Sequence, residues 1–299
     1  MKKFLSVVMV GMLTLFMVGC GSNTVENKDA KETSTVVDEK SDIKIIGGSM
    51  AVSEMLGKLD VNLIGRPTTQ YGISDKLKPL PEIGLPMSPD LEKIRALNPD
   101  IYITSGTLRE MLGNKLEENG INIVYLNLDS YDDVKKSIKE VGTKFNKEEN
   151  AEKLINEIEA KEKKVLENVD KNKKVKVMIL FGAPGHFMLA SKNSFAGSLI
   201  EKLGAENIAS KIDFKGQYVP FSLETALNEN PDVILRMYHG YIDEAKKQAD
   251  EEFATNPQWK NFKAVQENKV YDLDPEYFGV TGDIKIADSL EKMKDYLYK

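Results

Sequence analysis

Residues 147–170 read KEENAEKLINEIEAKEKKVLENVD, and this stretch decides the fold. Its many charged residues leave one thin apolar stripe, formed by Ala151, Leu154, Ile155, Ile158, Val165, Leu166 and Val169. At about 1.5 Å per residue, a helix of this length reaches roughly 36 Å. A helix so polar over that length is more typical of a bridge between two lobes than of a buried core. We therefore predict a bridging helix at 146–171.

Strand and helix patterns alternate on both sides of this predicted bridge. Short apolar runs rich in Val and Ile stand at 43–46, 61–65, 101–104, 121–125, 175–180, 233–235 and 270–273, with helical segments between them. Such alternation predicts an α/β fold with parallel, doubly wound sheets. We expect two Rossmann-like lobes, at 43–145 and 172–299, joined by the single long helix.

The two halves also share one short pattern. Glu92 precedes Pro99 by seven residues, and Glu224 precedes Pro231 by seven residues, with Asn-Pro-Asp at the end of each segment. Both segments predict a helix that stops at the proline and is followed by a strand. Asn-Pro-Asp is common at such junctions, so the repeat supports two similar lobes only together with the bridging helix.

The N-terminus predicts export. Lys2 and Lys3 precede an apolar run at 4–18 that is too short to span a bilayer comfortably. The run ends at Gly19-Cys20, and Cys20 is the only cysteine, so it cannot form an internal disulfide. Met-Val-Gly-Cys at 17–20 resembles the lipobox of bacterial lipoproteins. We expect a signal peptide at 1–19 and a lipidated Cys20; an ordinary secretory signal with an incidental cysteine is the alternative.

Composition and charge limit the structures and functions that the rest of the chain can have. Residues 20–42 contain almost no large apolar side chains after the cysteine, which predicts a flexible tether. Without residues 1–19 the chain has 280 residues and 39 basic against 47 acidic side chains, a net charge of −8. This mildly acidic balance gives no indication of nucleic-acid binding. No segment after Val18 is long and apolar enough to predict a transmembrane helix.

Met87 becomes the first candidate ligand-binding residue through the resemblance described below, and its local sequence alone favours no such role. It stands between a Gly-Leu-Pro turn and Ser88-Pro89-Asp90, where we predict a helix start with Ser88 as the N-cap and Pro89 at N1. A hydrophobic staple would need an apolar residue at N4, and in this register N4 is Glu92. A methionine that fills space in the core remains an alternative.

His239 is the second candidate. It follows the predicted strand 233–237, and ligands of open α/β sheets gather at the carboxyl ends of strands. A hydrogen-bonded loop histidine is the alternative. His186, the only other histidine, is interpreted as a loop residue next to the turn at 182–185; the alternative is that it neighbours the site or serves as a ligand itself.

The tether, the lobes and the bridging helix look like the rigid-backbone class of ABC substrate-binding proteins, which serves importers of siderophores, cobalamin and haem. Within that class, three segments are similar to the staphylococcal-type haem receptor lipoproteins of the iron-regulated surface determinant system. These segments are 81–89, 234–240, and 270–273 together with 278–281.

This resemblance implies that the cargo is haem b and that Met87 and His239 are the axial iron ligands. Thioether and neutral imidazole saturate the iron from its two faces, and Met/His ligation tends to raise the reduction potential. A six-coordinate iron binds no oxygen, which suits a carrier. A ferric siderophore or cobalamin remains the alternative cargo.

The porphyrin would also need an apolar wall and polar groups for its propionates. Candidates for the wall are Tyr71, Tyr218, Phe221, Tyr238 and Phe278. Candidates for binding the propionates are the backbone N–H groups of the turn 182–185, which includes Pro184 and Gly185. Proline itself has no N–H to donate. The side chains of Thr68 and Thr69 are further candidates. Each of these is equally consistent with an ordinary packing or turn role.

The same resemblance assigns partners. Glu92 and Glu224 would be surface glutamates that meet arginines of an ABC permease, one from each lobe; carboxylates favoured by the dipole of a helix N-terminus are the alternative. We expect the permease and its ATPase as partners, haem-donating surface proteins upstream, and a monomer. The lipid would anchor the chain at the outer face of the cytoplasmic membrane.

Other functions are less well supported. We find no nucleophile with a matching base, no Gly-rich phosphate loop and no carboxylate pair in a recognisable context, so we do not expect an enzyme. Zinc and manganese sites need clustered His and carboxylates, and the two histidines are far apart in the sequence. Anionic siderophores are usually bound by arginines, yet only Arg66, Arg95, Arg109 and Arg236 occur, scattered along the chain.

Overall fold

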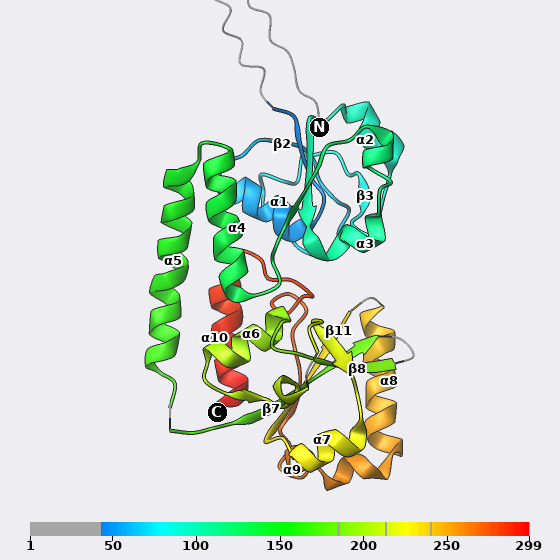
Figure 1. Cartoon of the computed structure of the whole chain (residues 1–299), viewed down its shortest axis with the longest axis vertical. Coiled ribbons are helices and arrows are strands. Elements are labelled where there is room, and N and C mark those ends of the chain that lie inside the picture. Colours follow the sequence, from blue (N-terminus) through cyan, green and yellow to red (C-terminus); the bar gives the residue numbers. More distant parts are fainter. Residues whose placement is uncertain (1–42, 171, 184–185, 213, 240, 299) are drawn as a thin grey trace, which may run out of the picture. The chain divides into compact units, whose positions relative to one another are not determined.

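The computed structural model describes residues 43–170, 172–183, 186–212, 214–239 and 241–298 (Figure 1). The predicted signal peptide, Cys20 and the tether at 20–42 lie outside these residues, as do Pro184 and Gly185. Among the helices that are described, none combines the length and the apolar character needed to cross a membrane.

The N-terminal lobe contains a four-stranded sheet in the order β2-β1-β5-β6, with every pairing parallel. This lobe therefore confirms the parallel, doubly wound prediction. A small antiparallel hairpin, β3-β4, stands apart from the sheet. The elements are β1 (Ile45–Gly47), α1 (Met50–Lys58), β2 (Leu63–Gly65), β3 (Gly84–Leu85), β4 (Ser88–Pro89), α2 (Leu91–Leu97), β5 (Ile101–Ser105), α3 (Arg109–Leu112) and β6 (Ile123–Leu126).

The C-terminal lobe contains a mixed sheet in the order β10-β8-β7-β11-β12, and β9 also pairs with β7. The three strands predicted in this lobe, β7, β11 and β12, pair in parallel as expected. The strands β8 and β10 were not predicted, and they add antiparallel pairings of β8 with β7 and of β10 with β8. His186 is the first residue of β8 and not a loop residue. The elements are β7 (Lys176–Ala183), β8 (His186–Ala190), α6 (Phe195–Lys202), β9 (Glu206–Asn207), β10 (Tyr218–Pro220), α7 (Leu223–Glu229), β11 (Val233–Tyr238), α8 (Ile242–Thr255), α9 (Lys263–Gln266), β12 (Val270–Asp272) and α10 (Ile286–Leu297).

The Asn-Pro-Asp segments end equivalent helices in the two lobes. Asn98 follows α2 with φ 49°, and Asn230 follows α7 with φ 47°. Asparagine tolerates this left-handed conformation better than most residues, and the proline that follows cannot continue the helix. The predicted sequence of helix, proline and strand is thus confirmed in both lobes.

The aspartates of these segments make the same contact in both lobes. The Asp100 carboxylate accepts the backbone N–H of Lys44 at 2.8 Å, and the Asp232 carboxylate accepts the backbone N–H of Lys176 at 2.9 Å. The two residues are 56 positions apart in each case, and the strands that follow pair in the same register. The lobes therefore repeat one another in structure as well as in sequence.

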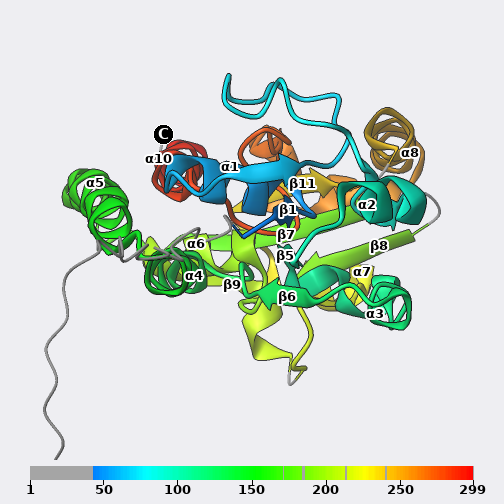
Figure 2. The ribbon, with the colours of Figure 1, turned by 90° about the horizontal axis from the view of Figure 1, so that it is seen from above.

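The bridging helix is α5 (Glu148–Glu167), which follows α4 (Tyr131–Lys144). It is shorter than predicted, because Asn146 has a positive φ before it and the helix ends at Asn168. Of the predicted stripe, Ala151, Leu154, Ile158 and Val165 are buried. α5 packs against α4 and α10, and α10 also packs against α6 (Figures 1 and 2).

The largest hydrophobic core runs without interruption from the N-terminal lobe through α4 and α5 into the C-terminal lobe. Separate clusters cover the other faces of the two sheets, around Ile94 and Tyr102 in the first lobe and around Trp259 and Phe262 in the second. A shared core of this kind resists relative movement of the lobes, because packed interiors deform little.

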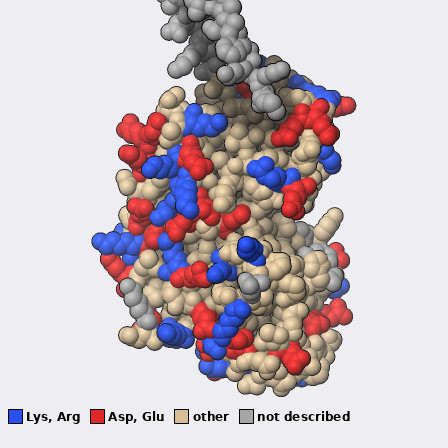
Figure 3. Space-filling model, in the orientation of Figure 1, with Lys and Arg blue, Asp and Glu red and all other residues tan. Residues whose placement is uncertain are grey.

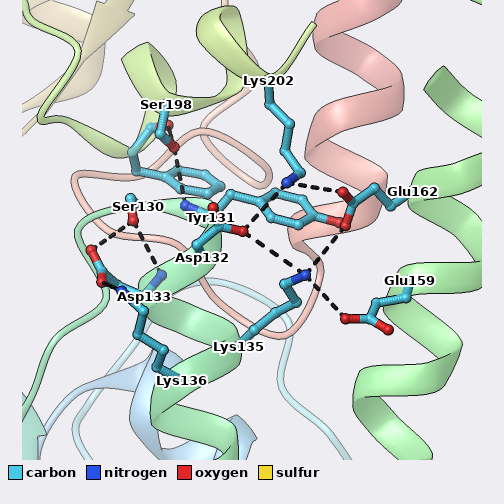
Figure 4. Close-up of polar contacts among 11 residues, drawn as sticks. Ser130, Tyr131, Asp132, Asp133, Lys135, Lys136, Glu159, Glu162, Ser198 and Lys202 are labelled. Carbon is cyan, nitrogen blue, oxygen red and sulfur yellow. Dashed lines mark hydrogen bonds and ion pairs between the residues drawn. The ribbon is translucent and has the colours of Figure 1, made fainter.

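A polar cluster also joins α4, α5 and α6 (Figure 4). The Lys202 ammonium lies 2.9 Å from Glu162 and 4.5 Å from the centroid of the Tyr131 ring. Lys135 forms ion pairs with both Glu159 and Glu162. Burial raises the pKa of Tyr131 above its usual value, so the phenol stays neutral between these charges.

The segment before α10 adds a second tie between the lobes. The Gly282 N–H donates to the carbonyl of Leu128 at 2.9 Å. A Cβ atom at Gly282 would lie only 2.7 Å from Val134 and 2.8 Å from Phe195, so only glycine fits there without movement of its neighbours.

Basic and acidic side chains are interspersed on the face shown in Figure 3, and neither sign forms one continuous patch there. Surface ion pairs of the molecule include Lys76 with Asp60 and Lys285 with Glu276. Exposed pairs of this kind contribute little stability individually.

Candidate ligand-binding site

Met87 lies in the two-residue turn of the β3-β4 hairpin. Leu85 pairs with Ser88, which leaves Pro86 and Met87 as the connection. Met87 is 46 % exposed and Leu85 is 55 % exposed. The thioether is therefore not held by core packing, and its position depends on the base of the hairpin.

The helix start predicted at Ser88 was wrong. Ser88 and Pro89 form β4, and α2 begins at Leu91 with Asp90 as its N-cap, whose carboxylate accepts two N–H groups of the first turn. Hairpin pairing holds Ser88 in extended backbone, so it cannot cap the helix. The N4 residue becomes the buried Ile94, while Met87 lies three residues before the N-cap and outside the staple position.

The base of the hairpin is bonded to the segment that follows β2. The Arg66 N–H donates to the Pro81 carbonyl, the Ile83 N–H to the Arg66 carbonyl, and the Thr68 N–H to the Gly84 carbonyl, at 3.0, 2.9 and 2.8 Å. Ile83 is fully buried, so one end of this base is anchored in the core.

Arg66 is 7 % exposed and is the one charged residue among the buried residues that the structure describes. Its Nε donates to the Leu77 carbonyl at 2.9 Å and its Nη1 to the Pro67 carbonyl at 3.0 Å. Nη1 also lies 3.0 Å from Glu82, whose second oxygen accepts the Thr68 hydroxyl at 2.9 Å. These donors, Thr68 first and then Arg66, hold the pKa of Glu82 below its usual value.

His239 follows β11 and is exposed. Its N–H donates to the Gly182 carbonyl at 3.3 Å, so the pairing between β7 and β11 extends one residue past the strand. The imidazole stacks on Phe181 with centroids 6.3 Å apart, and Phe181 stacks on Tyr218 at 4.1 Å. Two aromatic side chains thus adjoin the histidine, of which Phe181 is buried and Tyr218 is partly exposed.

The surroundings of the His239 ring favour its neutral form. Although the residue as a whole is exposed, the protein atoms around the imidazole disfavour its charge and lower its pKa from the ordinary 6.5. Neutral imidazole is the form that binds metal. Within the described residues, no side-chain hydrogen bond or ion pair engages the ring.

Tyr238 points away from this surface and into a polar network. Its hydroxyl donates to Asp272 at 2.8 Å, and the Nε of Arg236 donates to the same oxygen at 2.7 Å. Arg236 also pairs with Asp250, and Lys246 pairs with the other oxygen of Asp272. Burial alone would raise the pKa of Asp272, but these donors hold it below its usual value.

A cavity of about 660 Å³ lies between the first turn of α1, the loop after β2 and the segment before α10. Of the predicted propionate and wall residues, it brings together Thr69 and Tyr71. Met87 and His239 are not part of its lining.

The charges in this cavity are mainly acidic. Lys285 is the one basic residue among the described residues that line the cavity, and it pairs with Glu276 at 2.9 Å while its charge also acts on Asp283. The lining carboxylates, Glu54, Glu276 and Asp283, outnumber it. Burial raises the pKa of Asp283, and the charge of Glu54 raises it further. Two carboxylates at this end of the cavity would repel a propionate.

Other predicted pocket residues have structural contacts. Phe278 is 1 % exposed and lies beside Tyr296, with ring centroids 6.2 Å apart. Tyr238 is 6 % exposed and bound to Asp272, and the Thr68 hydroxyl is bound to Glu82. In this structure these three side chains are therefore engaged in packing or in hydrogen bonds within the protein.

Glu92 and Glu224 occupy equivalent exposed positions. Each is the second residue of a seven-residue helix, α2 or α7. The N-cap is Asp90 in the first lobe and Ser222 in the second.

The sequence analysis did not identify Arg66, Glu82 or Asp272 as part of the site. A local signal was available only on one side, because arginine is scarce in this chain and Arg236 stands three residues before His239. Arg66 stands 21 residues before Met87. The contacts that give these residues their roles join distant segments, which no local pattern shows.

Comparison with known proteins agrees with this architecture. Residues 7–277 match the family described as periplasmic binding protein. The chain is 31 % identical over 298 residues to the high-affinity heme uptake system protein IsdE of Staphylococcus aureus, covering 99 % of this chain and 98 % of that protein. The chain therefore belongs to the periplasmic binding proteins, a family that binds solutes for transport and is not one of enzymes.

Two solved structures are similar in fold and sequence. An ABC transporter substrate-binding protein from Listeria monocytogenes superposes with a TM-score of 0.80 at 36 % identity, covering 86 % of this chain and 99 % of that one. Staphylococcus aureus IsdE complexed with heme superposes with a TM-score of 0.80 at 33 % identity, with the same coverage. Substrate-binding proteins of ABC importers work with a permease and an ATPase.

Proposed function

We propose that this chain is the haem receptor of an ABC importer and that Met87 and His239 are the axial ligands of the haem iron. The observation that carries the proposal is the exposure and placement of these two side chains. Both are exposed, one stands in each lobe, and both are on segments that backbone hydrogen bonds hold in place. A soft thioether and a neutral imidazole form a donor pair known for haem iron.

The relatives support the cargo. The staphylococcal relative is named for heme uptake, and its structure is a complex with heme. Similarity over 99 % of this chain to the first and over 86 % to the second makes haem the preferred cargo for this chain. Beside His239, the partly exposed ring of Tyr218, which stacks on the buried ring of Phe181, offers apolar surface for a porphyrin.

The arginines argue against a ferric siderophore. Arg66 binds Glu82 and Arg236 binds Asp272 and Asp250, while Arg109 lies over the Tyr125 ring at 4.0 Å and Arg95 binds Asn119. Each guanidinium has a partner within its own lobe. A large anionic chelate would need such groups free, because it is usually bound by forked guanidinium contacts.

The remaining parts of the proposal concern delivery. Glu92 and Glu224 dock the receptor onto the permease, one from each lobe, and Cys20 carries the lipid that keeps the chain at the outer face of the cytoplasmic membrane. Labelling of the expressed protein with a radioactive fatty acid tests the anchor. Cys20→Ala is expected to abolish the label; a label that persists would contradict lipidation at this residue.

A haemin titration followed by visible spectroscopy tests the ligands. The wild type is expected to give a six-coordinate low-spin spectrum, which Met87→Ala and His239→Ala each lose. Met111→Ala and His186→Ala are matched controls, because Met111 is also a half-exposed methionine and His186 is the other exposed histidine. The controls should leave the spectrum unchanged.

Two results would overturn parts of the proposal. If neither Met87→Ala nor His239→Ala changes the spectrum or the affinity, the axial assignment is wrong. If the wild type fails to bind haem but binds a ferric siderophore tightly, the cargo is the siderophore.

A further inference from the structure

The β3-β4 hairpin presents Met87 without support from the core, so some other structure must fix the thioether. The turn residues Pro86 and Met87 have only the two pairs of the hairpin beneath them. Below those pairs, Ile83 is fully buried, and Gly84 adopts φ 93°, a conformation that favours glycine. The orientation of the turn is therefore decided where Glu82 and Ile83 meet the segment 66–68.

The Arg66 guanidinium is the centre of that junction. It contacts the Leu77 and Pro67 carbonyls and the Glu82 carboxylate, all within 3.0 Å. These groups belong to three different parts of the loop that connects β2 to the hairpin. Arginine keeps its charge even when buried, and its planar fork fixes direction as well as distance. A lysine would offer one point charge and could not hold all three partners in the same geometry.

Glu82 connects the Arg66 guanidinium to the hairpin. One carboxylate oxygen receives Arg66, and the other accepts the Thr68 hydroxyl at 2.9 Å. The Thr68 backbone N–H in turn donates to the Gly84 carbonyl at the first residue of β3. A closed set of contacts thus links a buried cation to the strand that leads to Met87.

We propose that Arg66, acting through Glu82, is the positioning residue of Met87. It holds the hairpin in one orientation before haem binds, so that the bond between the thioether and the iron costs little conformational entropy. The inference rests on the proposed function, in which Met87 is an axial ligand. Partners that orient a metal ligand contribute to affinity because they reduce the freedom that binding would otherwise remove. Without them, the imidazole still binds the iron but the thioether bond is occupied only part of the time.

Arg66→Lys and Glu82→Gln in the mature chain test this role with haemin as the probe. Both variants are expected to bind haem through His239 with a weakened thioether bond. The spectrum should shift from six-coordinate low-spin toward a high-spin form, and the reduction potential should fall, since methionine ligation raises it. Haem affinity should fall by about ten- to hundredfold, the range for lost partners of a metal ligand.

Matched controls separate positioning from a general effect of charge. Arg95→Lys changes an exposed arginine of the same lobe. Glu267→Gln changes a glutamate whose side chain is 40 % exposed, against 44 % for Glu82, and which also pairs with one basic side chain, Lys269. Neither control should alter the spectrum or the potential.

The outcomes distinguish this inference from the proposed function. If Arg66→Lys and Glu82→Gln are folded by circular dichroism and keep the wild-type spectrum and potential, the positioning role is wrong. If Met87→Ala leaves the wild-type spectrum unchanged, the ligand assignment itself fails, whatever the other variants do. Should Arg66→Lys not fold, Glu82→Gln decides alone, because its carboxamide oxygen can still accept the Thr68 hydroxyl.

Discussion

Glu92 and Glu224 hold the same position in two helices that repeat one another. Each is the second residue of a seven-residue helix that begins at a capping side chain and ends at a left-handed asparagine. Each helix then leads through Pro and Asp into a central strand whose preceding aspartate binds a backbone N–H 56 residues earlier. The equivalence follows from the fold and not only from the spacing in sequence.

We predict that loss of both glutamates uncouples the receptor from its permease. The double variant Glu92→Ala, Glu224→Ala is expected to bind haem with unchanged affinity and to lose receptor-stimulated ATP hydrolysis by the reconstituted importer. Each single variant should have a partial effect, because the other lobe can still dock. A matched double variant at Glu167 and Glu251, both exposed glutamates late in their helices, serves as the control. Full stimulation by the Glu92, Glu224 variant would contradict the docking role.

Gly282→Ala is expected to destabilise the protein by about 2 kcal/mol, because the new methyl group overlaps Val134 and Phe195 in a packed core. Gly57→Ala is the matched control. Gly57 lies within helix α1, and its added Cβ would contact only Leu77, at 3.5 Å. We therefore expect no loss of unfolding free energy and a gain of up to about 1 kcal/mol. Urea unfolding followed by circular dichroism measures both. Equal stabilities for the two variants would show that the core around Gly282 relaxes freely.

Asp283→Asn is expected to stabilise the protein at neutral pH and to have less effect in acid. Burial, aided by the charge of Glu54, raises the folded-state pKa of Asp283 above the ordinary 3.8. The folded state therefore holds this proton more tightly, and stability falls as pH rises from 3.8 through the folded-state pKa. Asparagine removes that loss and can still accept the Lys285 N–H. Unfolding free energies at pH 7 and pH 4 test the sign; a gain that is larger at pH 4 would refute it.

Tyr238→Phe distinguishes a wall residue from an anchoring one. The variant keeps the ring and removes only the hydroxyl that Asp272 accepts. We expect a loss of about 1 kcal/mol in unfolding free energy, since Arg236 and Lys246 still satisfy the carboxylate. Haem affinity should stay within about twofold, a difference of less than 1 kcal/mol. A large loss of affinity with intact stability would instead place the hydroxyl in contact with the cargo.

Elements with strong local patterns were predicted well. The stripe from Ala151 to Val165 marks the buried side of α5, and the Asn-Pro-Asp segments end helices where expected. The prediction of a helix start at Ser88 was wrong because Ser-Pro is a good helix start in isolation, while pairing with Leu85 places Ser88 in a hairpin. The prediction of a loop at His186 was wrong because β8 returns antiparallel to β7 after a short turn, which no local pattern shows.

The candidate site was predicted only in its outline. Met87 was selected through the resemblance of residues 81–89 to the haem receptors, and His239 through the same resemblance and its place after a strand. Both side chains are exposed, Met87 in a hairpin turn and His239 directly after β11. The apolar wall was less predictable, because an aromatic residue gives no local sign of whether its ring faces a ligand or the core. Phe278 and Tyr238 turn out to be buried, whereas Tyr71 is half exposed.

The sequence by itself determined the class of fold, the bridging helix and the repeated helix ends, because these depend on periodicity and turn chemistry among near neighbours. Tertiary structure alone decided what holds the candidate ligands in place. Arg66 reaches Leu77 and Glu82, and Tyr238 reaches Asp272 across 34 residues. Such contacts form only when folding brings distant segments together and burial makes each unpaired polar group costly.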